Sequence, residues 1–314
     1  MFLIRIVFAA MLLVASTGAA MAADKVTVLL DWFVNPNQAP LFVAKYIGAY
    51  EKYGLDVELI PPADPNLPPR LLAAGKADLA ISYQIQLSIL RDQGLPLKRV
   101  ATLIDTPLNS LTTISSTGIE SLADFKGKKI GVSISGVENA LVSAMIGTAG
   151  LSLDDVELIN VNFQNVPALM AKRVDGAIGS YRNFEVTELK SRGLTPVVFY
   201  PEENGVPIYD ELIVLANDDN IDNPKIVRFV KAMQEATIYL LNHPDEMWEA
   251  FIAEFPELDN DLNKTAWQLT QPRYAKNPFL LDTQRYDEMQ KFLVEKGVID
   301  KPQKVEEIAV ELPH

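Results

Sequence analysis

The chain contains no cysteine and only two histidines, His243 and His314, both in its C-terminal third. Without cysteine, neither a disulfide nor a lipid-anchored cysteine can form. A zinc site of clustered cysteine and histidine is also excluded. The position of the histidines argues against a nucleophile–histidine pair, and the sequence has no GxGxxG or GxxxxGK[ST] loop. We therefore expect neither a metal nor an organic cofactor.

Positive charge is scarce as well. Lysine and arginine number 28 against 41 aspartates and glutamates, which gives a formal net charge of −13. This balance repels phosphate backbones and anionic lipids, so nucleic acid and membrane surfaces are disfavoured as partners. A hydrophobic share of 48% with 22% charged residues is typical of a globular protein.

The first 22 residues have the pattern of an export signal. Arg5 is followed by an apolar run from Ile6 to Val14 and by the small-x-small sequence Ala20-Met21-Ala22. The run is shorter than the ~20 residues that span a bilayer, so we interpret residues 1–22 as a cleaved signal peptide. The alternative is a buried N-terminal helix. The sequence thus predicts a mature, periplasmic protein, and we expect it to be a monomer.

The mature chain carries the same succession of elements twice. Each copy has an apolar strand, a helical stretch that ends in Gly-Leu, the tetrapeptide VELI, a short helix and a buried strand. The first strands are residues 25–30 and 129–134, and the VELI segments are residues 57–60 and 156–159. The short helix and buried strand together occupy residues 71–83 in the first copy and 168–180 in the second. Each copy reads β-α-β-α-β, which predicts parallel strands joined by helical crossovers.

This duplication predicts an α/β protein of two lobes. Lobe 1 comprises residues 23–107 and 211–314, because the C-terminal section has one strand and several helices but no third VELI unit. Lobe 2 comprises residues 108–210. The chain then crosses between the lobes twice, which makes a hinge beside a cleft that can close.

Ligands of open parallel sheets bind beyond the carboxyl ends of the strands. Aromatic, amide, hydroxyl and carboxylate side chains follow four predicted strands. We select as ligand-binding candidates Trp32, Asn37, Gln38, Tyr83, Gln86, Ser135, Gly136, Tyr181, Asn183 and Glu185. Taken singly, each is also explained by packing, a turn or a solvated helix end. Together, rings with amides and a carboxylate suit a flat heteroaromatic ligand.

Three segments at these places resemble a known family. They are LDWFVNPNQAPLFVAK (30–45), LLAAGKADLAIS (71–82) and GSYRNFE (179–185), and they are similar to the periplasmic binding proteins for thiamine-pyrimidine precursors. The resemblance implies the type II periplasmic binding protein fold and an ABC importer whose permease is the partner. It also implies an aminopyrimidine stacked near Trp32, with Asn183 and Glu185 at its ring edge.

A related family of pyrimidine synthases shares this fold but is enzymatic. It carries a histidine in the segment that matches 37–40, where this chain has Gln38, and it has a cysteine-rich motif that is absent here. We therefore predict a binding protein rather than an enzyme. Arg182 and Gln38 depart from the transport family too, so a flavin or a sulfonate remains an alternative ligand. A sensor that acts on a membrane kinase would use the same cleft.

Overall fold

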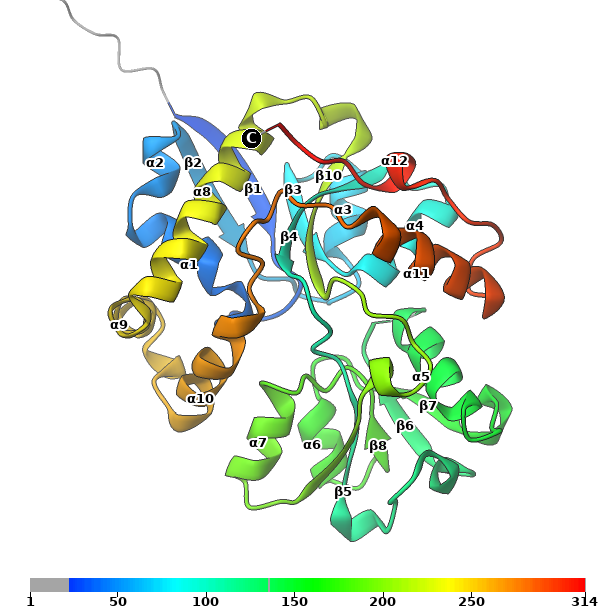
Figure 1. Ribbon diagram of the computed structural model, residues 1–314. Helices are drawn as coiled ribbons and strands as arrows, with labels where there is room; N and C mark the ends of the chain where they lie inside the picture. The colour runs from blue at the N-terminus through cyan, green and yellow to red at the C-terminus, as the bar shows by residue number, and fades with distance from the viewer. Residues whose placement is uncertain (1–22, 135, 314) are drawn as a thin grey trace, which may run out of the picture.

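The computed structural model describes residues 23–134 and 136–313, so the predicted signal peptide and Ser135 lie outside the described residues. The chain builds two five-stranded sheets, one in each half of Figure 1. Their strand orders are β2-β1-β3-β10-β4 and β7-β6-β8-β5-β9. The two sheets thus repeat one topology, as the duplicated sequence pattern predicts.

The first sheet combines parallel and antiparallel strands. It contains β1 (Asp24–Leu29), β2 (Leu55–Ile60), β3 (Leu79–Ser82), β4 (Leu97–Ile104) and β10 (Leu212–Asn217). Strand β1 pairs in parallel with β2 and β3, which confirms the predicted β-α-β-α-β unit. Strand β10 returns from the second lobe and runs antiparallel between β3 and β4. All residues of β3 and β10 are buried, because helices cover both faces of the sheet centre.

The second sheet has the same plan. It contains β5 (Leu111–Ile114), β6 (Lys129–Val132), β7 (Glu157–Asn160), β8 (Gly176–Ala177) and β9 (Pro196–Phe199). Strand β6 pairs in parallel with β7 and β8. Strand β5 enters from the first lobe and runs antiparallel between β8 and β9. The sequence pattern predicted β6, β7 and β8 but not β5 or β9.

Helices connect the parallel strands. In the first half they are α1 (Ala39–Tyr46), α2 (Ala49–Lys52), α3 (Pro68–Ala73) and α4 (Gln84–Asp92); in the second they are α5 (Val137–Gly147), α6 (Asn165–Met170) and α7 (Glu185–Ser191). The helical stretch predicted before Gly54 is interrupted at Gly48. Gly48 adopts the left-handed conformation with φ of 69° and so separates α1 from α2.

The C-terminal section is helical and returns to the first sheet. Its helices are α8 (Pro224–Asn242), α9 (Pro244–Glu254), α10 (Asp261–Thr270), α11 (Thr283–Glu295) and α12 (Val305–Ile308). Helix α8 packs on α1 and α12 packs on β4, whereas α10 reaches across to α7 of the other half (Figure 1). Among the described residues, no helix is both long and apolar enough to cross a membrane.

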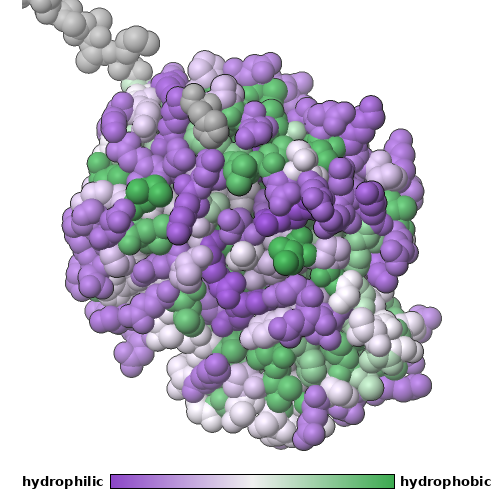
Figure 2. Space-filling view, in the orientation of Figure 1, coloured by the Kyte–Doolittle hydropathy of each residue, from purple (hydrophilic) through white to green (hydrophobic). Residues whose placement is uncertain are grey.

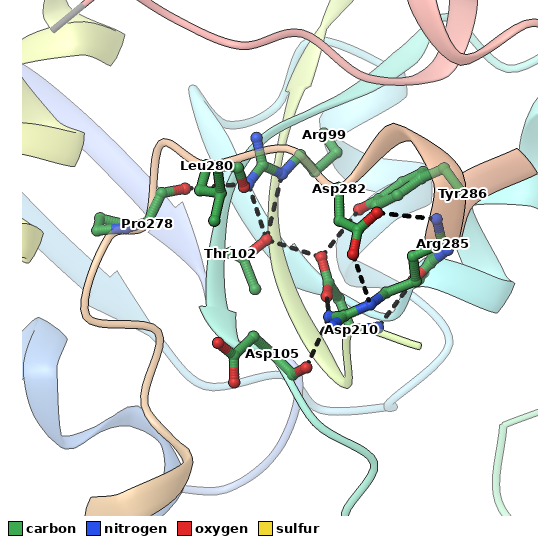
Figure 3. A network of polar contacts seen from close by, with 10 residues as sticks. Arg99, Thr102, Asp105, Asp210, Pro278, Leu280, Asp282, Arg285 and Tyr286 are labelled. Atoms are coloured by element: carbon green, nitrogen blue, oxygen red, sulfur yellow. Dashed lines mark hydrogen bonds and ion pairs between the residues drawn. The ribbon is translucent and has the colours of Figure 1, made fainter. Parts of the chain in front are cut away.

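Two segments, 105–110 and 200–211, connect the sheets. The proposed lobe boundaries at 107/108 and 210/211 fall within them. A polar network fixes their ends on the first lobe (Figure 3). Arg285 of α11 donates to the carbonyl oxygen of Asp105 at 2.7 Å and forms an ion pair with the carboxylate of Asp210. One arginine from the C-terminal section therefore holds both crossings.

Candidate ligand-binding site

A cavity lies between the two lobes. It encloses about 510 Å³, its open mouth included, which lies within the range of small-molecule sites. Five of the residues selected from the sequence line it: Trp32, Asn37, Tyr83, Tyr181 and Glu185. They come from both lobes, and each follows the end of a strand or lies close beyond it. The strand-end rule thus brings these five residues together.

Four selected residues are not among those that line this cavity: Gln38, Gln86, Gly136 and Asn183. Gln38 is fully buried; its amide donates to Asp31 Oδ1 at 2.9 Å, and its Oε1 accepts the N–H of Asn35 at 3.0 Å. Gln86 and Gly136 border a second, separate groove between α4 and the start of α5. Gln38 therefore orients a residue that does line the cavity. Ser135 lies outside the described residues.

Asn183 joins the two lobes. Its amide nitrogen donates to Asn37 Oδ1 at 2.6 Å and to Thr270 Oγ1 of α10 at 2.7 Å. All three side chains are buried. The Oδ1 atom of Asn183 is buried without a hydrogen-bond partner among the described residues. In this closed arrangement Asn183 stabilises the contact between the lobes, and its contact with a ring edge stays a prediction.

Aromatic rings from both lobes meet at the cleft. The ring centres of Trp32 and Phe163 lie 4.5 Å apart in an edge-to-face arrangement. The ring centres of Phe33 and Phe184 lie 6.0 Å apart. Trp32 and Phe184 line the cavity. Phe33 is 39% exposed and so lies toward the outside. The rings provide apolar faces on which a flat ligand can stack.

Four carboxyl groups line the same cavity. They belong to Asp31, Glu138, Glu185 and Glu211, and all four are buried. None of the described residues that line the cavity is a lysine, arginine or histidine. Of these four carboxyl groups, only that of Glu185 is among the ligand-binding candidates selected from the sequence. Asp31 and Glu138 follow β1 and β6, so the strand-end rule had the means to find them, whereas Glu211 precedes a strand and gave no signal.

Burial dominates the electrostatics of these groups. It raises the pKa of Glu185 to about 8, although the N–H of Tyr181 donates to its carboxylate at 2.8 Å and favours the charged form. It also raises the pKa of Glu138 to about 8, against the N–H groups of Ser133 and Ile134. The negative charges of neighbouring carboxylates add to this shift. A ligand that presents N–H donors to these carboxyls favours their ionised form, whereas the negative charge of an anion opposes it.

A glycine makes room for one of these carboxyls. Gly179 has a φ of +82°, and a Cβ atom there would lie 2.2 Å from Glu138 Oε1. Its N–H donates to Asn109 Oδ1 at 2.9 Å. A side chain at this position would displace the Glu138 carboxyl, so the close approach of the two segments depends on glycine.

The arrangement of the lobes defines the class of fold. The alkanesulfonate-binding protein SsuA from Xanthomonas axonopodis pv. citri bound to MOPS is similar in structure, with a TM-score of 0.74 at 15% identity over 93% of this chain and 99% of that one. The periplasmic aliphatic sulphonate binding protein SsuA from Escherichia coli has a TM-score of 0.69 at 14% identity, over 93% of this chain and 94% of that one. The chain thus has the two-lobed α/β fold of periplasmic binding proteins, as predicted.

The sequence then gives the family. Residues 35–247 match the family described as NMT1/THI5 like, and the chain belongs to this family. A putative thiamine biosynthesis protein of Haemophilus influenzae is 46% identical over 94% of this chain and 95% of that relative. A formylaminopyrimidine-binding protein of Halalkalibacterium halodurans is 31% identical over 72% of this chain and 69% of that relative. A 4-amino-5-hydroxymethyl-2-methylpyrimidine phosphate synthase of Saccharomyces cerevisiae is 26% identical over 79% and 76%.

Proposed function

We propose that this protein is a periplasmic, non-enzymatic solute-binding protein that delivers an aminopyrimidine of the thiamine-precursor type to the permease of an ABC importer. The observation that carries the proposal is the composition of the cavity. Aromatic rings stand beside four buried carboxyl groups, and no basic side chain is among the described lining residues. An aminopyrimidine has a flat face for the rings, and its N–C–NH₂ edge pairs with a carboxyl group when the ring nitrogen and the carboxyl share one proton. The names of two relatives point to the same chemistry.

The same composition disfavours a sulfonate, although sulfonate-binding proteins share the fold. A buried anion needs a cation or several N–H donors. The nearby Arg182 forms an ion pair with Glu202 at 2.7 Å and stacks on Tyr200, 4.1 Å from the ring centre. Its guanidinium is thus held at the hinge and does not line the cavity.

The enzyme alternative is disfavoured at one position. Where the resemblance places a histidine of the synthases, this chain has Gln38, whose side chain is fully buried. Both of its polar atoms are bonded, to Asp31 and to Asn35. The residue at this position therefore offers no base to a ligand in the cavity.

Calorimetry with 4-amino-5-hydroxymethyl-2-methylpyrimidine tests the proposal. We expect saturable binding with one ligand per chain and no heat with an alkanesulfonate. Incubation with the bound pyrimidine, iron and pyridoxal phosphate should return the pyrimidine unaltered. Binding of the sulfonate alone, or a new pyrimidine product detected by mass spectrometry, would contradict the proposal.

Trp32→Ala should weaken pyrimidine binding by about 1–3 kcal/mol, the range for the loss of an aromatic stacking partner. Trp32 lines the cavity and packs edge-to-face on Phe163, so both the ligand and the closed cleft lose a contact. Titration monitored by calorimetry measures the change. Trp32→Phe is the matched control and should retain most of the affinity. Equal affinities of the wild type and Trp32→Ala would remove Trp32 from the site.

A further inference from the structure

Two neighbouring residues of the second crossing, Asp210 and Glu211, are held by different parts of the molecule. The Asp210 carboxylate accepts from Thr102 Oγ1 at 2.9 Å and from Tyr286 Oη at 3.5 Å, and it pairs with Arg285 (Figure 3). These partners lie on β4 and α11, which belong to the first lobe. Asp210 is thus fixed to that lobe.

Glu211 is held by the other crossing and by the second lobe. Its Oε2 atom accepts the N–H groups of Leu108 at 2.7 Å and Asn109 at 3.0 Å. Its Oε1 atom accepts from the hydroxyl of Tyr181 at 3.1 Å. Glu211 is 2% exposed, and it lines the ligand cavity together with Asn109 and Tyr181. The side chain of Glu211 therefore links the second crossing to the first crossing and to the second lobe, and it also lines the cavity.

The same division is seen on the first crossing. The carbonyl oxygen of Asp105 is bonded by Arg285 of the first lobe, whereas that of Leu108 accepts the N–H of Arg182 of the second lobe at 2.9 Å. Between these anchors lie Thr106 and Pro107. Asp210 and the strand β10, which begins at Leu212, both belong to the first lobe. Rotation of the lobes must therefore be taken up at 106–107 and at residues before Asp210.

We propose that Glu211 is a ligand-contacting residue that also holds the hinge at its closed angle, so that the two crossings respond to occupancy of the cavity. The proposal extends the binding function proposed above. When the lobes open, the Tyr181–Glu211 bond must lengthen, because Tyr181 belongs to the moving lobe. A ligand that donates an N–H to the Glu211 carboxylate adds a bond that exists only when the cleft is closed around it. Binding then favours the closed state by this differential contact.

Glu211→Gln tests the proposal on the full mature chain. The glutamine keeps the shape, but its amide oxygen accepts weaker bonds than a carboxylate, and its NH₂ group cannot accept from Tyr181. Because the chain has no cysteine, Lys76→Cys in lobe 1 and Lys190→Cys on α7 of lobe 2, both exposed, allow specific spin labelling. Pulsed electron resonance then gives the distribution of distances between the lobes, without ligand and with 4-amino-5-hydroxymethyl-2-methylpyrimidine.

The matched control is Glu138→Gln, which changes another buried carboxyl of the cavity away from both crossings. We expect both variants to bind the pyrimidine about tenfold or more weakly, as for loss of one charge-assisted bond. Only Glu211→Gln should add an open population to the ligand-free distribution. Tyr181→Phe, which removes only the hydroxyl, should change the distribution in the same direction and serves if Glu211→Gln does not fold.

Distances in Glu211→Gln and Tyr181→Phe that match the wild type would overturn the hinge role, whatever the affinity. An unchanged affinity in Glu211→Gln would overturn the ligand contact. If the wild type fails to bind the pyrimidine, the proposed function is wrong, and the ligand-free distributions still decide the role of Glu211 in the hinge.

Discussion

Replacing Glu185 by glutamine is expected to lower the affinity for 4-amino-5-hydroxymethyl-2-methylpyrimidine about tenfold or more. The carboxylate accepts the Tyr181 N–H through Oε2, which fixes its orientation in the cavity wall. When the ligand and Glu185 share one proton, an ionised Glu185 accepts from the exocyclic amine and from the protonated ring nitrogen, and both bonds are charge-assisted. Loss of one such bond costs roughly 1.5–3 kcal/mol, and 1.4 kcal/mol is a factor of ten in affinity.

Calorimetry on the folded variant measures this loss. Glu188→Gln is the matched control, since Glu188 lies one turn along α7 and pairs with Arg192 at 2.7 Å outside the cavity. It should leave the affinity unchanged. An alkanesulfonate should respond in the opposite direction and bind Glu185→Gln as well as or better than the wild type. A variant that keeps the wild-type pyrimidine affinity would contradict the proposed ligand.

Arg99→Met is expected to lower the free energy of unfolding by about 3 kcal/mol or more. Arg99 is fully buried on β4. Its guanidinium donates to Thr102 Oγ1 and to the carbonyl oxygens of Pro278 and Leu280 (Figure 3). It also donates to the carbonyl oxygens of Phe279 and Val310. Methionine fills similar space but removes all of these donated bonds. The carbonyl oxygen of Pro278 keeps the N–H of Thr102 at 2.9 Å, whereas those of Leu280 and Val310 lose the guanidinium. Each buried group left unpaired costs roughly 1–3 kcal/mol.

Chemical denaturation monitored by circular dichroism gives the difference. Arg70→Met is the control, because Arg70 is exposed and its side chain has one bond, to Gln93 at 3.2 Å. Surface changes of this kind fall within about 0.5 kcal/mol. Equal effects of the two variants would show that the Arg99 network adds nothing to stability. The segment held by Arg99 leads directly into α11, so the same substitution should also loosen the hold of Arg285 on the crossings.

The parallel units of both sheets could be predicted because their signals are local. Short apolar strands, amphipathic helices and the repeated VELI segments lie next to one another in the sequence, and a parallel pair needs the crossover that the sequence shows. Strands β5 and β9 carry four residues each and have no such partner nearby. Their pairing depends on segments more than 80 residues apart, so local pattern could not assign it.

The candidate site divides in the same way. Trp32, Tyr83, Tyr181 and Glu185 follow strands, and the rule for parallel sheets selects them from sequence order alone. Glu211 is different, because its bonding partner Leu108 lies 103 residues earlier. Only the passage of the chain between the lobes brings these two crossings together.

Sequence alone therefore determined the duplicated α/β lobes, the lack of cysteine chemistry and the aromatic and amide residues at the strand ends. The tertiary structure decided which polar groups are buried. Asp31 and Glu138 belong to a residue class that is mostly exposed. Their positions after β1 and β6 mark them as site candidates, but no sequence pattern shows that they are buried. Burial in the folded chain removes them from water and raises their pKa values. Desolvation depends on everything that surrounds a group in space, and so the raised pKa values of these carboxyl groups follow only from the tertiary structure.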